Sequence, residues 1–281
     1  MIEPARFVSA AARGLLVAAF LILLAPLGRT ADARDVPYVP TPPEAVKKML
    51  EMANVQPDDL LYDLGSGDGR IVIAAIRDFG VKRAIGIDID SQRIRESWQN
   101  AQNAGVADQA DFRRGNIFEE DFSDANVITM YLLSRVNRDL RPRLLNELRP
   151  GTRLVSHQFT MGDWEPDAEA TAANRSLYLW VVPAKVAGEW RVEEGADDLR
   201  LSLRQDYQMV SGDMTAFGQS APIAAGRLNG ENVVLSATAV RDGAPVEVRF
   251  EGRVTDEDTM EGQLLVGGSP TTVTISRVRQ N

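Results

Sequence analysis

A glycine-rich loop between an apolar run and a helical pattern constrains the fold of this chain more than any other feature. The segment Asp63-Leu-Gly-Ser-Gly-Asp-Gly-Arg70 follows the apolar residues 60–64 and opens the helical pattern of residues 71–79. Glycines at such a place let the backbone turn tightly and approach a ligand, while N–H groups at the helix terminus face it. The loop therefore predicts a ligand site at the end of a buried strand.

Strand-like and helical segments alternate on both sides of this loop. Apolar runs predict strands at 60–64, 84–89, 112–115, 126–133 and 152–159, and helical spacing predicts helices at 71–79, 91–104 and 140–148. A further helix is expected after Thr41, because two prolines and Glu44 follow it in a capping pattern. Such alternation builds a parallel sheet covered on both faces. We expect an α/β domain over residues 36–190.

The pattern changes from about Trp190 onward. Apolar and polar residues alternate at 199–204, 235–239, 246–251 and 273–275, as in strands with one buried face. The pairs Asn229-Gly230 and Asp242-Gly243 are hairpin turn signals between such runs. Residues 191–281 are therefore predicted to form a small antiparallel β domain, either a sandwich or a barrel.

Two polar residues at later strand ends indicate what the glycine loop binds. Asp88 ends the second strand about 20 residues after the loop, where a carboxylate accepts hydrogen bonds from ribose hydroxyls. Asn116 follows the third strand, within reach of an adenine edge. Together the loop and these residues predict a nucleoside ligand; the alternative is that the glycines only make a tight turn.

The loop differs from the G-x-G-x-x-G pattern of dinucleotide sites, because it runs Gly65-x-Gly67-x-Gly69 and an acid, Asp63, precedes it. An acid before the glycines suits a cofactor with an amino-acid tail and no phosphates. The segment from Asp63 to Arg70 resembles the S-adenosylmethionine-binding motif of the seven-strand methyltransferases, which have a Rossmann-like sheet. By this resemblance the cofactor-binding residues are Asp63, Gly65, Ser66 and Gly67 at the methionine end, Asp88 at the ribose and Asn116 at the adenine. The family more often has Asp at the adenine position, and Asn116 keeps an acceptor oxygen there.

A narrower resemblance covers about residues 36–185. Three segments, 39–42, 63–72 and 148–164, are similar to the mitochondrial protein-lysine methyltransferases that modify ATP synthase subunit c and the adenine nucleotide translocase. This resemblance implies protein-lysine methylation, with the acceptor on a membrane-associated protein. It implies nothing for the C-terminal β domain.

In-line methyl transfer requires that the lysine amine is aligned with the methyl group. The lysine must first lose its proton, which a desolvated channel beside the cofactor favours by lowering its pKa. Tyr131, after the fourth strand, is the candidate catalytic residue lining that channel; the alternative is a core aromatic side chain. His157 is either a general base or a histidine whose neighbours satisfy it on a strand. Asp163 and Trp164 either shape the acceptor site or belong to a solvated loop that the Trp anchors.

Composition excludes several other functions. The chain has 40 acidic against 31 basic residues, a net charge of −9, which argues against a nucleic-acid substrate. No cysteine is present and His157 is the only histidine, so thiolate and multi-histidine metal sites are excluded and no metal is expected. Methylation of a small molecule, or a non-enzymatic exported scaffold or ligand-binding protein on this fold, remain the alternatives to protein methylation.

The N-terminus has the pattern of an export signal. Arg6 and Arg13 precede the apolar residues 14–27, and Ala31-Asp32-Ala33 resembles a cleavage site. We therefore expect residues 1–33 to be a signal peptide and the protein to be periplasmic. The alternative is an uncleaved anchor that leaves the chain facing the periplasm.

Overall fold

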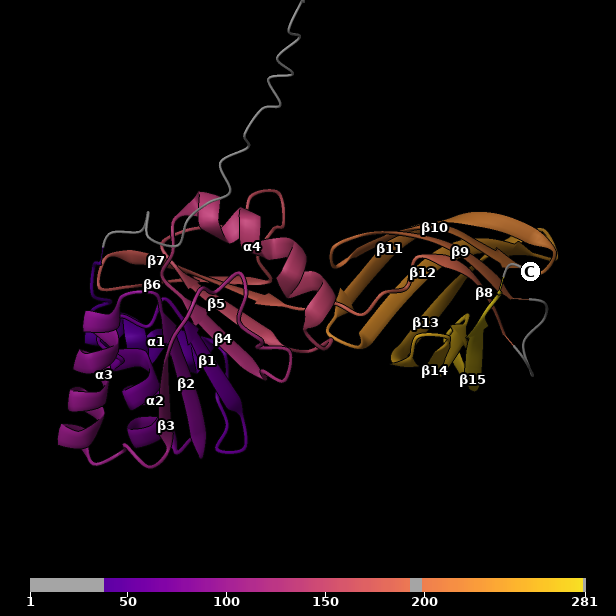
Figure 1. The fold of residues 1–281 in the computed structure, drawn as a ribbon. Coiled ribbons are helices and arrows are strands. Elements are labelled where there is room, and N and C mark those ends of the chain that lie inside the picture. The colour runs from indigo at the N-terminus through magenta and orange to yellow at the C-terminus, as the bar shows by residue number, and fades with distance from the viewer. Residues whose placement is uncertain (1–37, 193–198, 280–281) are drawn as a thin grey trace, which may run out of the picture. The chain divides into compact units, whose positions relative to one another are not determined.

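A seven-stranded mixed sheet forms the first half of the molecule (Figure 1). The computed structural model describes residues 38–192 and 199–279. The strands are β1 (Leu60–Leu64), β2 (Arg83–Asp88), β3 (Ala110–Arg114), β4 (Val127–Met130), β5 (Arg153–His157), β6 (Ala168–Ala172) and β7 (Arg175–Val181). Their order is β3-β2-β1-β4-β5-β7-β6. The first five strands are parallel, and β7 runs antiparallel to both β5 and β6, so the expected methyltransferase-type sheet is confirmed.

Helices cover both faces of this sheet, as the alternation in the sequence predicts. They are α1 (Pro43–Met52), α2 (Arg70–Phe79), α3 (Ser91–Ala104) and α4 (Ser134–Glu147). Successive residues of a strand point to opposite faces. Accordingly, Leu61 packs into the core under α1, α2 and α3, and Tyr62 packs into the opposite core with residues of α4.

Two helix starts differ from the sequence prediction. Thr41 does not cap α1: the N-cap residue is Pro42 and no side chain caps this terminus. The Thr41 Oγ1 atom instead lies 3.0 Å from Nδ1 of His157, a partner 116 residues away that local patterns cannot reveal. Helix α4 begins at Ser134, earlier than the expected 140, because Val136 and Asn137 continue its buried face.

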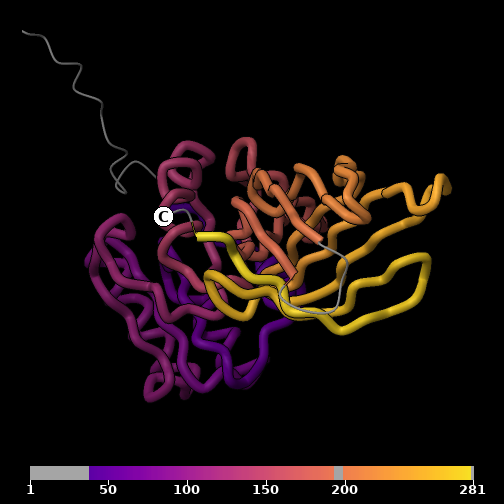
Figure 2. Tube along the Cα trace, turned by 90° about the vertical axis from the view of Figure 1, so that its right-hand side faces the viewer, coloured from indigo at the N-terminus to yellow at the C-terminus, as the bar shows by residue number. Residues whose placement is uncertain are grey.

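The second half is a closed antiparallel barrel of eight strands (Figures 1 and 2). They are β8 (Gly188–Val192), β9 (Arg200–Asp206), β10 (Met209–Ala216), β11 (Gln219–Asn229), β12 (Asn232–Arg241), β13 (Ala244–Asp256), β14 (Thr259–Val266) and β15 (Ser269–Arg277). Strand β15 pairs with β8, for example Ile275 with Val192, and this pairing closes the barrel. Both predicted hairpin turns, at 229–230 and 242–243, lie between paired strands.

Large apolar side chains occupy the inside of the barrel. Trp190, Leu235, Phe250 and Ile275 are all at most 1% exposed and belong to one hydrophobic cluster. Filling of this kind favours a structural or docking role for the barrel over storage of a ligand.

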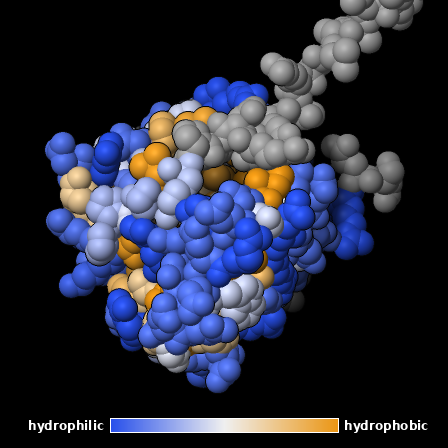
Figure 3. Space-filling view, turned by 60° about the vertical axis from the view of Figure 1, so that its left-hand side comes forward, coloured by the Kyte–Doolittle hydropathy of each residue, from blue (hydrophilic) through white to orange (hydrophobic). Residues whose placement is uncertain are grey.

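The expected signal segment, residues 1–33, lies outside the described residues. No helix in the described ranges is long and apolar enough to cross a membrane. On the face drawn in Figure 3, hydrophilic residues predominate and hydrophobic residues form small, separate patches.

Candidate active site

The glycine loop lies where β1 ends and α2 begins, and backbone hydrogen bonds to β2 hold it. The N–H groups of Gly65 and Ser66 both donate to the carbonyl oxygen of Ile87, at 2.8 and 3.0 Å. Gly65 and Gly67 have φ values of +80° and +54°, which residues with a Cβ rarely adopt. From α3, the Ser97 hydroxyl donates to the Gly67 carbonyl oxygen at 2.8 Å. The loop is therefore rigid on the side away from the pocket.

Asp88 links the end of β2 to this loop. Its Oδ2 atom accepts from the N–H of Gly67 at 2.8 Å, and its Oδ1 atom accepts from the N–H of Asp90 at 2.9 Å. Burial raises the pKa of the Asp88 carboxyl, and the two backbone hydrogen bonds oppose that shift. Each carboxylate oxygen keeps a lone pair for a further donor, as binding to a ribose diol requires.

Asp63, the acid before the glycines, is buried at the end of β1. Its Oδ1 atom accepts a hydrogen bond of 2.8 Å from the Thr129 hydroxyl on β4. Burial raises the pKa of the Asp63 carboxyl to about 7; the Thr129 hydrogen bond opposes this, and the charges of Asp88 and Asp68 add to it. A buried carboxyl among other acids is stabilised in its charged form by a cationic ligand.

A third acid, Asp68, is neutralised within the chain. Arg70 donates from Nε and Nη2 to the two carboxylate oxygens of Asp68, at 2.9 and 2.7 Å. Burial opposes ionisation of Asp68, but Arg70 outweighs it and lowers the pKa. Arg70 also donates to the Thr41 carbonyl oxygen at 2.9 Å, which ties the segment before α1 to the loop.

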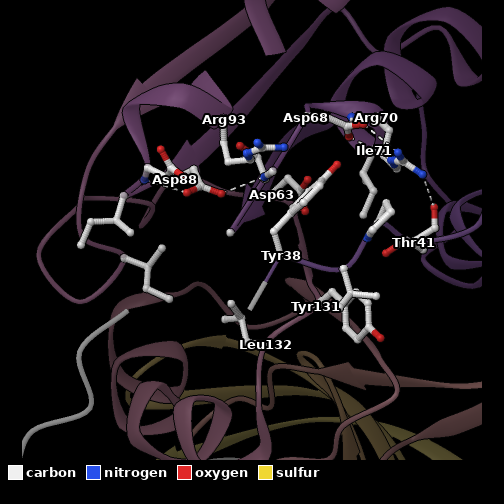
Figure 4. A pocket seen from close by; sticks show the side chains of 18 of the residues that line it. Tyr38, Thr41, Asp63, Asp68, Arg70, Ile71, Asp88, Arg93, Tyr131 and Leu132 are labelled. Carbon is white, nitrogen blue, oxygen red and sulfur yellow. Dashed lines mark hydrogen bonds and ion pairs between the residues drawn. The ribbon is translucent and has the colours of Figure 1, made fainter. Parts of the chain in front are cut away.

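Tyr38 also lines the pocket, although it was not predicted as a site residue from the sequence. Figure 4 shows its ring lying across the pocket, between Arg93 and the Asp68–Arg70 pair. The Arg93 guanidinium lies 4.4 Å from the centre of the Tyr38 ring, within cation–π range. The sequence signal for Tyr38 is its position directly before segment 39–42, which is similar to the mitochondrial protein-lysine methyltransferases.

These residues enclose a pocket of about 370 Å³ at the carboxyl ends of the parallel strands, within the range of about 300–1,000 Å³ of small-molecule sites. Asp63, Gly65, Ser66, Gly67, Asp88 and Tyr131, all predicted from the sequence, line it. The other lining residues were not predicted as site residues from the sequence: Tyr38, Val39, Pro40, Thr41, Asp68, Arg70, Ile71, Ile89, Asp90, Arg93, Gly115, Ile117 and Leu132. In the described part of the chain, no cluster of three or more acidic or histidine side chains could hold a metal ion.

Asn116 is the predicted cofactor residue that the structure does not place in the pocket lining. Its Oδ1 atom accepts from the N–H of Phe118 at 3.1 Å, and its Nδ2 group donates to Glu119 at 2.9 Å. The side chain thus stabilises the turn after β3, and Gly115 and Ile117 on either side of it form the pocket surface. The adenine role of Asn116 stays a prediction.

Tyr131 follows β4 and packs between two rings at the edge of the pocket. Its ring centre lies 3.9 Å from that of His157 and 6.1 Å from that of Phe159. Burial, together with the charge of Arg175, lowers the pKa of His157 to about 4, so this ring is neutral at pH 7 and poorly suited to act as a general base. No hydrogen bond joins the Tyr131 hydroxyl to another described residue, so it is available to a ligand.

The structure places Asp163 and Trp164 at the barrel and not in the pocket lining. Trp164 is fully buried, and its Nε1 donates to Oε1 of Gln208 at 2.9 Å. Asp163 accepts a hydrogen bond of 2.9 Å from the Tyr207 hydroxyl. The second alternative, a solvated loop that the Trp anchors, is therefore confirmed, since Asp163 is exposed and Trp164 is buried. The sequence did not predict the partners Tyr207 and Gln208, which lie more than 40 residues further along the chain.

Comparisons with known proteins point to one activity. A sequence model of the ANTKMT methyltransferase domain matches residues 63–168. The protein-lysine N-methyltransferase of Saccharolobus islandicus (strain REY15A) is 50% identical over 151 residues, which cover 52% of this chain and 94% of that protein. The chain belongs to the protein-lysine N-methyltransferases. It is thus an S-adenosylmethionine-dependent methyltransferase, as the resemblance in its glycine loop implies.

Two further relatives agree with this assignment. The adenine nucleotide translocase lysine N-methyltransferase of Mus musculus is 32% identical, over 57% of this chain and 70% of that protein. A crystal structure described as an RNA methyltransferase from Salinibacter ruber, in complex with S-adenosyl-L-homocysteine, is 50% identical with a TM-score of 0.51. It covers 53% of this chain and 96% of that one. The family model ends at residue 168, before the β barrel begins, and each of these relatives covers a little more than half of the chain.

The pocket residues fit S-adenosylmethionine. Arg70 neutralises Asp68, and Asp63, Asp88 and Asp90 are the other carboxylates among the lining residues. Such a charge pattern suits an ammonium and a sulfonium and disfavours phosphates. A Cβ on Gly65 would lie 2.8 Å from Leu132, and one on Gly67 would lie 2.6 Å from Tyr38, so the space above the loop depends on both glycines.

Gly67→Ala is expected to weaken S-adenosylmethionine binding about tenfold. The new Cβ would meet the Tyr38 ring at 2.6 Å, and alanine at a φ of +54° adds about 1–2 kcal/mol of backbone strain. Gly105→Ala is the matched control, because Gly105 has a φ of +71° but nothing within 4 Å of its Cβ. Calorimetric titration of both variants checks this; equal dissociation constants would contradict the proposed close approach.

Proposed function

We propose that this methyltransferase transfers a methyl group from S-adenosylmethionine to the Nζ atom of a lysine in a protein. The observation that carries the proposal is the 50% identity to a protein-lysine N-methyltransferase over 94% of that protein, in the part of the chain that holds the pocket. The acidic chain, with its net charge of −9, supports an acceptor that presents a basic side chain.

The geometry beside the pocket supports an amine as the acceptor. S-adenosylmethionine would supply a methyl group bound to a sulfonium: the bond from a neutral amine nitrogen to the methyl carbon would form in line as the S–C bond breaks, S-adenosylhomocysteine would leave, and the methylated ammonium would lose a proton to water. Asp63 and Asp88 would hold the cofactor, and Tyr131 would orient the amine through its hydroxyl. The rings of His157 and Phe159 shield that place from water, and an apolar environment lowers the pKa of a lysine and so favours its reactive neutral form.

Three buried atoms around the end of β5 add to this support. Nε2 of His157, Oδ1 of Asn137 and Oε1 of Gln158 have no hydrogen-bond partner within the described ranges. Buried polar atoms are normally paired, and unpaired ones often mark a place where a ligand or water binds. The amide oxygens are acceptors, which complement the N–H groups of an amine.

Radioactive methyl transfer tests the proposed function. The full chain is incubated with S-adenosyl-[methyl-³H]methionine and a cell extract separated into protein, RNA and small-molecule fractions. Tritium in Nε-methyllysine after hydrolysis of the protein fraction is the expected result. Label confined to RNA, the acceptor named for the Salinibacter ruber structure, would overturn the proposal, as would label confined to small molecules.

Tyr131→Phe is expected to lower kcat about tenfold in this assay while the dissociation constant of S-adenosylmethionine stays unchanged. The change removes the hydroxyl that would orient the amine and keeps the ring between His157 and Phe159. Tyr178→Phe, on β7, serves as the control. A kcat equal to that of the wild type would assign Tyr131 to packing alone.

We further propose that the acceptor is membrane-associated and that the chain acts outside the cytoplasm. The charged and apolar pattern of residues 1–33 supports export, and the resemblance to methyltransferases of ATP synthase subunit c and the adenine nucleotide translocase supports a membrane-associated acceptor. The mass of the protein recovered from its native envelope checks the first point. Loss of residues 1–33 is expected, and a cytoplasmic chain that retains them would contradict it.

A further inference from the structure

The barrel contacts the same loop whose first residues pack against Tyr131. This loop, residues 158–165, leaves β5 and carries Phe159 beside the Tyr131 ring. It then reaches Trp164, whose indole is fully buried. The two-residue turn between β9 and β10, Tyr207 and Gln208, meets the loop at that end.

Gln208 makes both of its side-chain hydrogen bonds to the loop. Its Oε1 atom accepts from Nε1 of Trp164 at 2.9 Å, and its Nε2 group donates to the Glu165 carbonyl oxygen at 2.8 Å. Gln208 is only 3% exposed. A buried amide with both ends paired fixes the position of its partners, because breaking either bond leaves an unsatisfied buried group.

Tyr207 holds the same segment through its ring and its hydroxyl. The ring stacks on Trp164 with centres 5.7 Å apart and planes 16° apart. The hydroxyl donates to Asp163, and Arg141 of α4 pairs with the other oxygen of that carboxylate. Both interactions lower the pKa of Asp163 to about 2, so this network stays charged at neutral pH.

Side chains from three parts of the fold bind the loop carbonyls in turn. Asn137 and Arg141 of α4 donate to Phe159 and Met161, at 3.1 and 2.7 Å. Trp180 of β7 donates to Trp164 at 2.8 Å. Gln208 completes the series, so the barrel supplies the support at the far end of the loop.

The end of the loop that lies beside Tyr131 has a strained backbone. The Phe159 N–H donates to the His157 carbonyl oxygen at 2.9 Å, so residues 157–159 form a tight three-residue turn. Gln158, in its centre, has a φ of +71°, a conformation that costs free energy in a residue with a side chain. Surrounding contacts must hold such a turn in place, and it sets where Phe159 meets Tyr131.

We propose that the Tyr207–Gln208 turn of the barrel is a positioning element of the acceptor site, which acts through the loop 158–165 on Phe159 and Tyr131. The barrel would then be part of the methyltransferase machinery of this chain, although the family model matches only residues 63–168. This inference rests on the proposed function, in which Tyr131 orients the acceptor amine.

Gln208→Leu tests the inference, and Gln263→Leu is its control. Gln263 lies in the same barrel, and its side chain donates to Thr272 of the neighbouring strand and not to the loop 158–165. In the full chain, Gln208→Leu is expected to speed amide hydrogen exchange in residues 158–165 at least tenfold. It should also raise about tenfold the amount of protein extract that gives half-maximal methyllysine formation, with the dissociation constant of S-adenosylmethionine unchanged. Gln263→Leu should change neither quantity.

A second variant separates positioning from folding. Tyr207→Phe keeps the stacking on Trp164 and removes only the hydrogen bond to Asp163, so a smaller change in the same two readouts is expected. Unchanged exchange and unchanged acceptor dependence in Gln208→Leu would overturn the inference, as would equal losses in Gln263→Leu. A wild-type chain that forms no methyllysine would refute the proposed function instead, while the exchange measurement would still test the support of the loop.

Discussion

Asp88→Ala is expected to weaken S-adenosylmethionine binding about 100-fold, equivalent to about 3 kcal/mol, while the chain stays folded. The substitution removes two things at once. It deletes the carboxylate that would accept from the ribose hydroxyls, where hydrogen bonds to a charged group contribute about 1.5–3 kcal/mol each. It also frees the N–H of Gly67, which Asp88 now holds at 2.8 Å, so the glycine loop loses its link to β2.

Asp88→Asn separates these two contributions. Asparagine keeps an acceptor oxygen for Gly67 or for Asp90 but loses the negative charge. We expect this variant to bind with an affinity between those of the wild type and Asp88→Ala. Calorimetric titration gives the dissociation constants, and circular dichroism with thermal melting checks that both variants are folded. Wild-type affinity in folded Asp88→Ala would remove the ribose assignment.

The sheet domain could be predicted from the sequence because its information is local. Each strand is a short apolar run, and the loop from Asp63 to Arg70 marks the strand end where a ligand binds. The parallel order brings Asp63 and Asp88 to one edge of the sheet, since β1 and β2 are neighbours in register. These two facts place the glycine loop and the two carboxylates, but not most of the other residues that line the pocket.

Other parts of the site depend on contacts between distant residues. The sequence pattern marks Thr41 as a helix-capping residue. In the structure its hydroxyl instead lies within hydrogen-bond distance of His157, and Pro42 is the N-cap. Asn116 follows the third strand as expected, but its side chain bonds within its own turn. Tyr38 contacts Arg93 in the pocket, and Arg70 ties Thr41, three residues further on, to the loop. The contacts of Thr41 and Tyr38 join residues far apart in the sequence, whereas Asn116 bonds to residues two and three positions later, as a local turn pattern allows.

The closure of the barrel and its contact with the sheet domain also could not be predicted from local sequence patterns. Alternation and turn residues predict antiparallel strands, but a sandwich and a barrel share that pattern. What decides between them is the pairing of β15 with β8, in which Ile275 meets Val192 across most of the domain. Likewise, the hydrogen bond from Trp164 to Gln208 shows where the barrel meets the loop after β5, and nothing near either residue in the sequence predicts it.

The second large effect concerns the charge of Asp63: S-adenosylmethionine is expected to bind about 20-fold more tightly at pH 7.5 than at pH 5.5. With a pKa of about 7 in the free protein, about 3% of the Asp63 carboxyls are ionised at the lower pH and about three quarters at the higher. A cationic ligand binds the ionised form, so binding lowers this pKa and releases a proton. His157, with its pKa of about 4, stays largely neutral over this range.

Asp63→Asn is expected to bind about 20-fold more weakly than the wild type at pH 7.5 and to lose most of this pH dependence. Asparagine keeps an oxygen for the Thr129 hydroxyl, so the local packing is retained. The stability of the folded chain and its affinity for S-adenosylmethionine depend on pH in opposite directions. The folded chain holds a proton on Asp63 that the unfolded chain releases near pH 4, so the ligand-free wild type loses stability as the pH rises through about 7.

The melting temperature therefore distinguishes a lost charge from a damaged fold. At pH 8 the ligand-free Asp63→Asn variant should melt at or above the temperature of the wild type, because it no longer buries a carboxylate among other acids. Weak binding together with an undiminished melting temperature would assign Asp63 to the cationic end of the cofactor. Binding by the wild type that is equally tight at pH 5.5 and 7.5 would show that the ligand gains nothing from this charge, and the methionine end would have to be placed elsewhere in the pocket.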